Sequence, residues 1–228
     1  MENRSINIAI IAEVAAALQH LNRQVVFVGG AVISLYANDP APDEVRPTED
    51  VDIALHIAAL NDWQQTIEEL LVLGFYPDPE RHTINSYKYK NIPVDIMSAT
   101  AGPWGPTNRW YKPGFENLWT ANAEEQTVYI LSAPCFLATK FEAYRNRGKD
   151  YRTSHDMEDI IYVLDNRTTI VEETAQADPS VRNFLIQQLD SLITAGILEE
   201  VLMAHINPLM LKERIPLVKQ KIKQILNL

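Results

Sequence analysis

RPTEDVDIAL, residues 46–55, is the stretch that decides the fold of this chain. Apolar and polar residues alternate over VDIALHI, residues 51–57, which predicts a strand with Asp50 and Asp52 on one face and the apolar side chains on the other. The Cα atoms of two such residues lie about 6.6 Å apart, so their carboxylates can share a hard cation such as Mg²⁺. A strand with a solvated acidic face is the alternative for an isolated D-x-D pattern.

A glycine pair lies between two predicted elements upstream. QVVFV, residues 24–28, is a β-branched run that predicts a strand, and AVISLYA, residues 31–37, resumes at helical length after Gly29 and Gly30. Such a corner lets the backbone approach a phosphate at the start of a helix, where Ser34 can add a hydroxyl. A simple tight turn is the alternative.

A third carboxylate follows on a later strand. TINSYKYK, residues 83–90, and IPVDIMS, residues 92–98, predict a hairpin with a tight turn. Asp95 lies on the face opposite the apolar side chains of the second strand, and its neighbours are Pro93 and Met97. An unpaired carboxylate in such surroundings is costly, and metal binding is one way to satisfy it. An aspartate on an edge strand is the alternative.

The remaining chain changes character near residue 133. Before it, the pattern predicts an amphipathic first helix, a helix over NDWQQTIEELLVLGF capped by Asn61 or Asp62, and a strand at residues 126–132. The segment from Ala101 to Asn122 has no regular period and predicts a long loop, in which Trp104, Trp110 and Tyr111 either stack on a base or pack locally. After it, the chain predicts only helices, at residues 134–147, 155–165, 180–195, 197–204 and 209–226.

This order predicts an α+β fold, close to α/β, with a small mixed sheet flanked by helices and a helical C-terminal part. We expect a core over residues 1–132 and a helical part over residues 133–228 that completes the cleft of the site.

Composition excludes several classes of function. The net charge of −10 argues against binding to duplex DNA, which needs a basic face. The single cysteine, Cys135, excludes a disulfide framework. No run approaches the roughly 18 apolar residues that cross a membrane, and the N-terminal segment lacks a signal-peptide pattern. We therefore expect a soluble, cytoplasmic protein.

The helix that begins near Pro134 carries a lysine among apolar side chains. Lys140 lies within a stripe that contains Phe136 and Phe141, so its ammonium either reaches a ligand or snorkels to the rim. Asp156 shares a face of the next helix with Ile160 and so points inward. Favourable electrostatics at the start of that helix is the alternative role for Asp156, and also for Asp159.

Two ordered sets of residues carry a family resemblance. FVGG, residues 27–30, followed by RPTEDVDI, residues 46–53, resembles the polymerase-beta-like nucleotidyltransferase superfamily, in which a glycine turn precedes a D-x-D strand and a third acid completes a metal site. The R-x-T-x-D-x-D stretch, with KFEAYRNRGKD at 140–150 and SHDMEDI at 154–160, resembles the AbiEii-type toxins of type IV toxin–antitoxin systems. The resemblance covers about residues 25–165.

The resemblance implies a nucleotidyltransferase core that moves a nucleoside monophosphate from a nucleoside triphosphate (NTP) to a hydroxyl of RNA, tRNA or protein. It implies Mg²⁺ or Mn²⁺ on Asp50, Asp52 and Asp95, with Lys140 and Asp156 as further catalytic residues. The residues expected to bind the nucleotide are Gly29, Gly30, Ser34, Arg46, Thr48 and Lys140.

An antitoxin partner is a further expectation from the resemblance. The alternatives are transfer to a small molecule, as in antibiotic-modifying enzymes, a non-catalytic domain that binds a nucleotide or a partner, and a helical scaffold with incidental acids.

Overall fold

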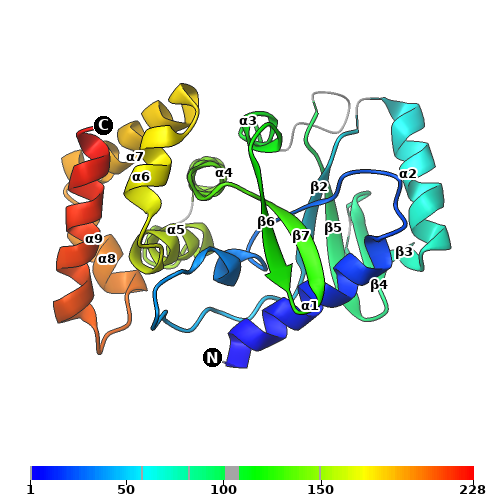
Figure 1. Ribbon diagram of the computed structural model, residues 1–228, viewed down its shortest axis with the longest axis horizontal. Helices are drawn as coiled ribbons and strands as arrows, with labels where there is room; N and C mark the ends of the chain where they lie inside the picture. Colours follow the sequence, from blue (N-terminus) through cyan, green and yellow to red (C-terminus); the bar gives the residue numbers. More distant parts are fainter. Residues whose placement is uncertain (1, 58, 82, 101–107, 149) are drawn as a thin grey trace. The chain divides into compact units, whose positions relative to one another are not determined.

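The computed structural model describes residues 2–57, 59–81, 83–100, 108–148 and 150–228 (Figure 1). The chain divides into two compact units. The first contains residues 1–35 and 44–131, and the second contains residues 36–43 and 132–228. Every strand among these described residues belongs to the first unit, while the second is built from helices.

The first unit is organised around one mixed sheet, which confirms the predicted α+β class. Its strands are β1 (Val26–Val28), β2 (Val51–Leu55), β3 (Phe75–Pro77), β4 (Ser86–Tyr89), β5 (Ile92–Ser98), β6 (Leu118–Ala123) and β7 (Gln126–Leu131). Their order across the sheet is β3-β4-β5-β2-β1-β7-β6. The pairs β2–β5 and β1–β7 are parallel, and the other neighbours are antiparallel. The central position of β1 and β2 brings the glycine corner beside the D-x-D strand.

The burial of β2 and β5 follows the alternation of their sequences. Val51 and Ile53 on β2, and Val94 and Ile96 on β5, are almost completely buried. Asp52 on β2 and Asp95 on β5, which lie between them, are only half-buried, whereas Ala54 on the same face as Asp52 is completely buried. Strand β1 is too short and central to alternate, and all three of its residues are buried.

Helices α1 (Glu2–Leu18) and α2 (Leu60–Val72) flank the sheet of the first unit, with the short α3 (Tyr111–Phe115). Helix α1 packs on β2, β6 and β7 through the apolar face predicted for it. Helix α2 begins earlier than expected, with Ala59 as its N-cap. The Asp62 carboxylate accepts the Ala59 N–H at 3.1 Å, so Asp62 caps the helix from inside its first turn.

Two local predictions are wrong. The helix predicted at residues 31–37 is a single 3₁₀ turn, η1 (Ile33–Tyr36). Its β-branched residues have a low helix propensity, and Pro40 disfavours the helical conformation for the residue that precedes it. The loop predicted at residues 101–122 contains α3 and most of β6, because hydrogen bonds to β7 create a strand that has no local period. Trp104 lies outside the described residues.

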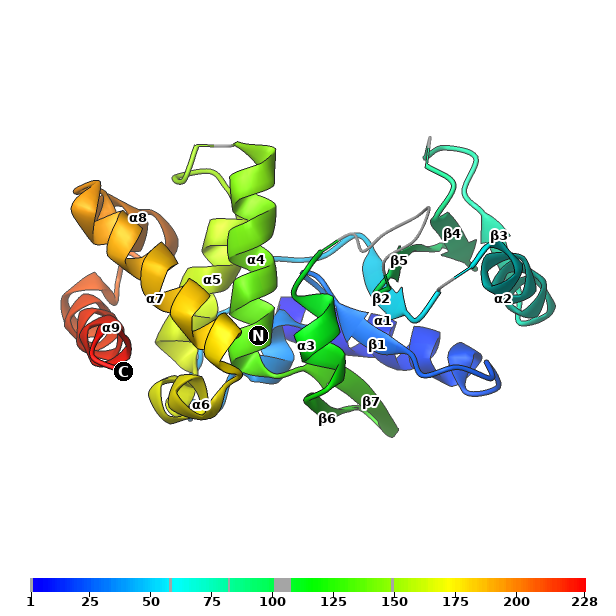
Figure 2. The ribbon, with the colours of Figure 1, turned by 90° about the horizontal axis from the view of Figure 1, so that it is seen from above.

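The second unit contains the predicted C-terminal helices and one more. They are α4 (Ala133–Arg147), α5 (His155–Asn166), α6 (Ile170–Gln176), α7 (Pro179–Thr194), α8 (Leu198–His205) and α9 (Leu211–Leu226). Helix α4 packs against α5, α6 and α7 (Figure 2). Gly148 ends α4 in the left-handed conformation, which only glycine adopts without strain.

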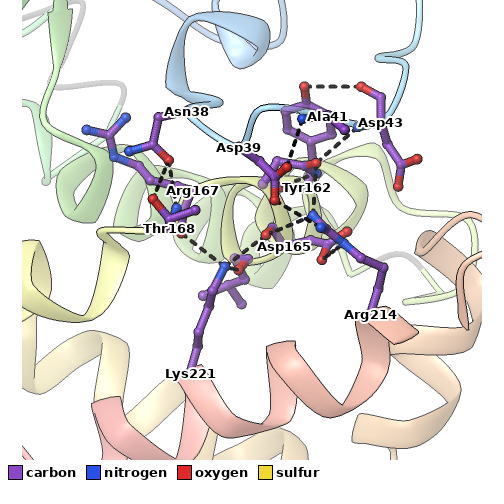
Figure 3. Close-up of polar contacts among 12 residues, drawn as sticks. Asn38, Asp39, Ala41, Asp43, Tyr162, Asp165, Arg167, Thr168, Arg214 and Lys221 are labelled. Atoms are coloured by element: carbon purple, nitrogen blue, oxygen red, sulfur yellow. Dashed lines mark hydrogen bonds and ion pairs between the residues drawn. The ribbon is translucent and has the colours of Figure 1, made fainter. Parts of the chain in front are cut away.

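A partly buried polar network ties residues 36–43 to α5 and α9 within this unit (Figure 3). Arg214 on α9 donates to Asp165 at 2.8 Å and to Asp39 at 2.9 Å. Lys221 donates to three main-chain carbonyls at the end of α5, at 2.8–3.1 Å. Burial lowers the pKa of Lys221, so these carbonyls compensate an ammonium that has lost much of its water. The network explains why eight residues from early in the chain belong to the helical unit.

Within the described ranges, no helix is both long and apolar enough to span a lipid bilayer.

Candidate active site

Two of the predicted acids are direct neighbours in the sheet. Asp52 on β2 pairs in register with Asp95 on the parallel strand β5. Paired residues on adjacent strands project to the same face, and adjacent strands lie about 4.8 Å apart. Both residues are half-buried on the face opposite the apolar core. Residues separated by 43 positions in sequence therefore present their carboxylates to one site.

Arg81 joins this site and was not predicted. Its guanidinium bridges two carboxylates, with Nη2 at 3.0 Å from Asp50 Oδ2 and Nη1 at 2.9 Å from Asp95 Oδ2. Burial alone would lower the pKa of Arg81, but the hydrogen bond to Asp50 and the charge of Asp95 outweigh it, so the pKa of Arg81 is raised. The guanidinium is therefore a fixed positive charge among the acids. Its sequence neighbourhood, DPERH, carries no pattern that would have identified it.

Ser86 is a second residue that sequence reasoning missed. It lies opposite Asp95 in the β4–β5 hairpin, and its hydroxyl donates to Asp95 Oδ1 at 2.5 Å. Here a signal was available, because a tight turn after Tyr89 fixes the register and counting back from it places Ser86 beside Asp95. Asp95 thus accepts hydrogen bonds from both Ser86 and Arg81.

The glycine corner makes room for side chains from the RPTEDVD stretch. Gly29 has φ +71°, and a Cβ atom there would lie 1.8 Å from Asp52 Oδ2. At Gly30 a Cβ atom would lie 2.4 Å from Arg46 Nη2. The two glycines are therefore needed for the close approach of Asp52 and Arg46. Their predicted contact with phosphate stays a prediction.

Ser34 and Thr48 differ in their surroundings. Ser34 is fully buried in η1, and its hydroxyl has no hydrogen-bond partner among the residues that the structure describes. Thr48 donates from Oγ1 to the Asp50 carbonyl at 3.0 Å and lies 3.5 Å from one Asp50 carboxylate oxygen. Thr48 therefore orients Asp50, while a phosphate contact by Ser34 would require η1 to rearrange.

Asn7 holds the R-x-T loop in place from helix α1. Its Nδ2 donates to the Arg46 carbonyl at 3.1 Å, and its Oδ1 accepts the Thr48 N–H at 3.2 Å. Asn7 is fully buried, so these two bonds satisfy main-chain groups that water does not reach. An asparagine on the apolar face of an amphipathic helix was the available signal for this role.

Replacing Asn7 with alanine is expected to lower the free energy of unfolding by about 1–3 kcal/mol, because two buried main-chain groups lose their partners. Chemical denaturation measures the change. Asn3→Ala is the matched control, since Asn3 lies one turn earlier, is only partly buried and makes one such bond, to the Val45 carbonyl. Equal losses of unfolding free energy in the two variants would show that the two hydrogen bonds of Asn7 contribute no more than the single bond of Asn3.

The second unit contains a charge cluster of its own. Lys140 Nζ lies 2.6 Å from Asp159 Oδ2 and 3.6 Å from Asp156 Oδ1, while Arg147 Nη1 lies 2.7 Å from Asp156 Oδ2. Lys140, Asp156 and Asp159 expose at most 8% of their surface. The sequence pattern singled out Lys140 and Asp156 but assigned Asp159 only to helix-start electrostatics. Asp159 is in fact the nearer partner of Lys140.

Other candidates are less available for chemistry. Trp110 and Tyr111 are buried, which favours local packing over stacking on a base. Burial raises the pKa of the Cys135 thiol to about 12, so it stays protonated at neutral pH.

The donor chemistry at the sheet fits a hard divalent cation. Asp50, Asp52 and Asp95 offer the carboxylate oxygens that Mg²⁺ and Mn²⁺ prefer, and two of them already hold a cation, the Arg81 guanidinium. Within the described part of the chain, no three acidic, histidine or cysteine side chains are already arranged as a metal-binding group. The metal site stays a prediction, and it requires Arg81 to move.

Comparison with known proteins identifies the family. The family described as "Nucleotidyl transferase AbiEii toxin, Type IV TA system" matches residues 13–214. No curated protein is significantly similar to this chain. A crystal structure of an antigenic nucleotidyltransferase-like protein from Paracoccidioides brasiliensis has a similar fold, with a TM-score of 0.51 and 20% sequence identity. The match covers 83% of this chain and 91% of that one. The chain thus belongs to the AbiEii family of nucleotidyltransferase toxins.

Proposed function

We propose that this nucleotidyltransferase moves a nucleoside monophosphate from an NTP to a hydroxyl of RNA, tRNA or protein, with Mg²⁺ or Mn²⁺ on Asp50, Asp52 and Asp95. One observation carries the proposal. Asp52 and Asp95 are paired in register on parallel strands, beside the glycine corner that Asp52 contacts.

The chemistry follows from these groups. The acceptor oxygen forms a bond to the α-phosphorus, the bond from that phosphorus to the β-phosphate oxygen breaks, and pyrophosphate leaves. A divalent cation bound there supplies positive charge to the triphosphate and the departing pyrophosphate. Asp95 takes the proton of the hydroxyl as a general base. For this role one of its oxygens must be released from Ser86 or Arg81, because each of the two oxygens accepts a hydrogen bond in this structure.

The remaining predicted residues position the nucleotide. In this proposal Gly29, Gly30 and Arg46 bind the phosphates through main-chain N–H groups and a guanidinium. Thr48 keeps Asp50 oriented toward the cation. Ser34 contacts phosphate after a rearrangement of η1.

Lys140 and Asp156 have a proposed role in binding the nucleotide or activating the acceptor. This role competes with a purely structural one, since both side chains are paired within the helical unit. The Lys140 variants considered in the Discussion distinguish the two.

We also propose that the protein acts as a toxin with an antitoxin partner, which its family membership supports. The family description names a toxin of a type IV TA system, and the proposed antitoxin partner rests on that membership alone.

The test is incubation with each α-labelled NTP, Mg²⁺, total RNA and cell lysate, and comparison with Asp52→Asn. Asparagine keeps the size of the side chain that packs on Gly29 and removes its charge. Label on RNA, on protein or on a small molecule identifies the acceptor class, provided that Asp52→Asn does not transfer it. Equal labelling by both forms, or none by the wild type, would contradict the proposal.

A further inference from the structure

Arg81 occupies two of the carboxylates that are proposed to bind the cation. Its two terminal nitrogens each bind a different proposed metal ligand, at 3.0 Å to Asp50 and 2.9 Å to Asp95. A planar guanidinium suits such a bridge, because its N–H groups point outward in a fixed fork. The proposed cation and Arg81 therefore compete for the same carboxylate oxygens.

The main chain around Arg81 is anchored, while its side chain is not covered. The Arg81 N–H donates to the Asp78 carbonyl at 3.3 Å, and Asp78 in turn pairs with Lys88 at 3.2 Å. The Arg81 side chain keeps 31% of its surface exposed. An anchored residue with a partly exposed guanidinium can change partners by rotating its side chain, without refolding of the hairpin.

We propose that Arg81 is a resident counter-ion of the acidic site, which a metal–nucleotide complex displaces more readily than metal alone does. The inference rests on the proposed function. A divalent cation that arrives alone meets a fixed positive charge on its ligands, and Coulomb repulsion opposes their joint occupation. When a triphosphate arrives with the cation, its phosphate oxygens offer Arg81 a bidentate partner in place of the two carboxylates.

This arrangement makes loading of the site conditional. Metal and nucleotide bind together, because each removes an obstacle to the other: the metal replaces Arg81 on the carboxylates, and the phosphates accept the released guanidinium. Such mutual dependence is a coupling free energy between two ligands. Without a metal, Arg81 thus neutralises the carboxylates of the site. Its release from them depends on bound nucleotide.

The direct test is Mn²⁺ binding, measured by electron paramagnetic resonance without nucleotide. Removal of the competitor in Arg81→Ala is expected to lower the Mn²⁺ Kd by about tenfold or more relative to wild type. Arg81→Lys keeps the charge but loses the fork, so an intermediate Kd is expected. Lys90→Gln is the matched control, because Lys90 lies in the turn of the same hairpin and pairs with Glu13, which is not a proposed ligand. It should bind Mn²⁺ as the wild type does.

Thermal melting provides a second readout that is independent of turnover. Without metal, Arg81→Ala is expected to melt below the wild type, because its acids lack their counter-ion. Mn²⁺ alone should raise the Tm of Arg81→Ala by more than it raises the Tm of the wild type. With a non-hydrolysable NTP analogue present, the wild type should bind Mn²⁺ tightly. The difference in Mn²⁺ Kd between the wild type and Arg81→Ala should then become smaller.

The outcomes separate this inference from the proposed function. If the wild type binds Mn²⁺, Asp52→Asn does not, and Arg81→Ala binds no more tightly than wild type, the counter-ion role is overturned while the metal site stands. If none of the proteins binds Mn²⁺, with or without the analogue, both proposals fail.

Discussion

Lys140→Met is expected to lower the free energy of unfolding by about 3–5 kcal/mol, one of the two largest effects that we expect from a single substitution. Lys140 is 8% exposed and lies 2.6 Å from Asp159. Its removal takes away the ammonium that lies 2.6 Å from the Asp159 carboxylate, which is 1% exposed. Urea denaturation at neutral pH measures the loss.

Two variants sharpen this test. Arg152→Met removes a cation from an exposed ion pair with Asp150 in the same unit, and we expect its stability to remain close to wild type. Lys140→Met combined with Asp159→Leu removes both charges and should recover much of the lost stability, because an apolar pair often replaces a buried ion pair at little cost. A Lys140→Met protein as stable as the wild type would show that the ion pair contributes nothing to the fold.

The same variants address catalysis. If Lys140 only supports the fold, the double variant should transfer nucleotide at close to the wild-type rate under conditions where it is folded. If Lys140 binds the nucleotide or activates the acceptor, activity should stay low even though stability returns.

Gly29→Ala is expected to reduce nucleotidyl transfer by about 100-fold, because a displacement of about 1 Å at a catalytic group has effects of that size. The added Cβ would lie 1.8 Å from Asp52 Oδ2, so the carboxylate has to move away from its position beside Asp95. Alanine at φ +71° also adds about 1–2 kcal/mol of backbone strain. Initial rates of transfer and urea denaturation measure the two effects separately.

Gly196→Ala provides a matched control for the backbone strain. Gly196 has the same φ of +71°, but a Cβ atom there would have no neighbour within 4 Å. This variant should lose a similar amount of stability from strain and retain full activity. If Gly29→Ala retains activity as well, the close approach of Asp52 to the corner is not needed for catalysis.

The local predictions that succeeded depend on short-range periodicity. The strand at residues 51–57 was predicted from alternation, and the structure contains β2 there with its apolar residues buried. Five C-terminal helices were predicted within a few residues of their observed ends, because their apolar positions repeat at helical spacing. The two errors arose where local signals were weak: η1 is too short to show a period, and β6 is defined by its pairing with β7.

The site was predictable only in part, for the same reason. A D-x-D pattern fixes that Asp50 and Asp52 point to one side, whatever surrounds them. By contrast, Arg81 acts on Asp50 from 31 positions away, and Asn7 holds Thr48 from 41 positions away. No spacing rule links such residues, because the chain between them can fold in many ways.

The sequence by itself determined most of the helices and strands, which of their faces are apolar, and that Asp50 and Asp52 share a face near a glycine corner. Only the tertiary structure decided that Asp95 pairs with Asp52, that Arg81 bridges two of the acids, and that Asp159 is the nearest partner of Lys140. The physical reason is the range of the forces involved. Backbone geometry sets the direction of a side chain within one element, whereas strand register and buried ion pairs depend on the packing of segments far apart in the chain.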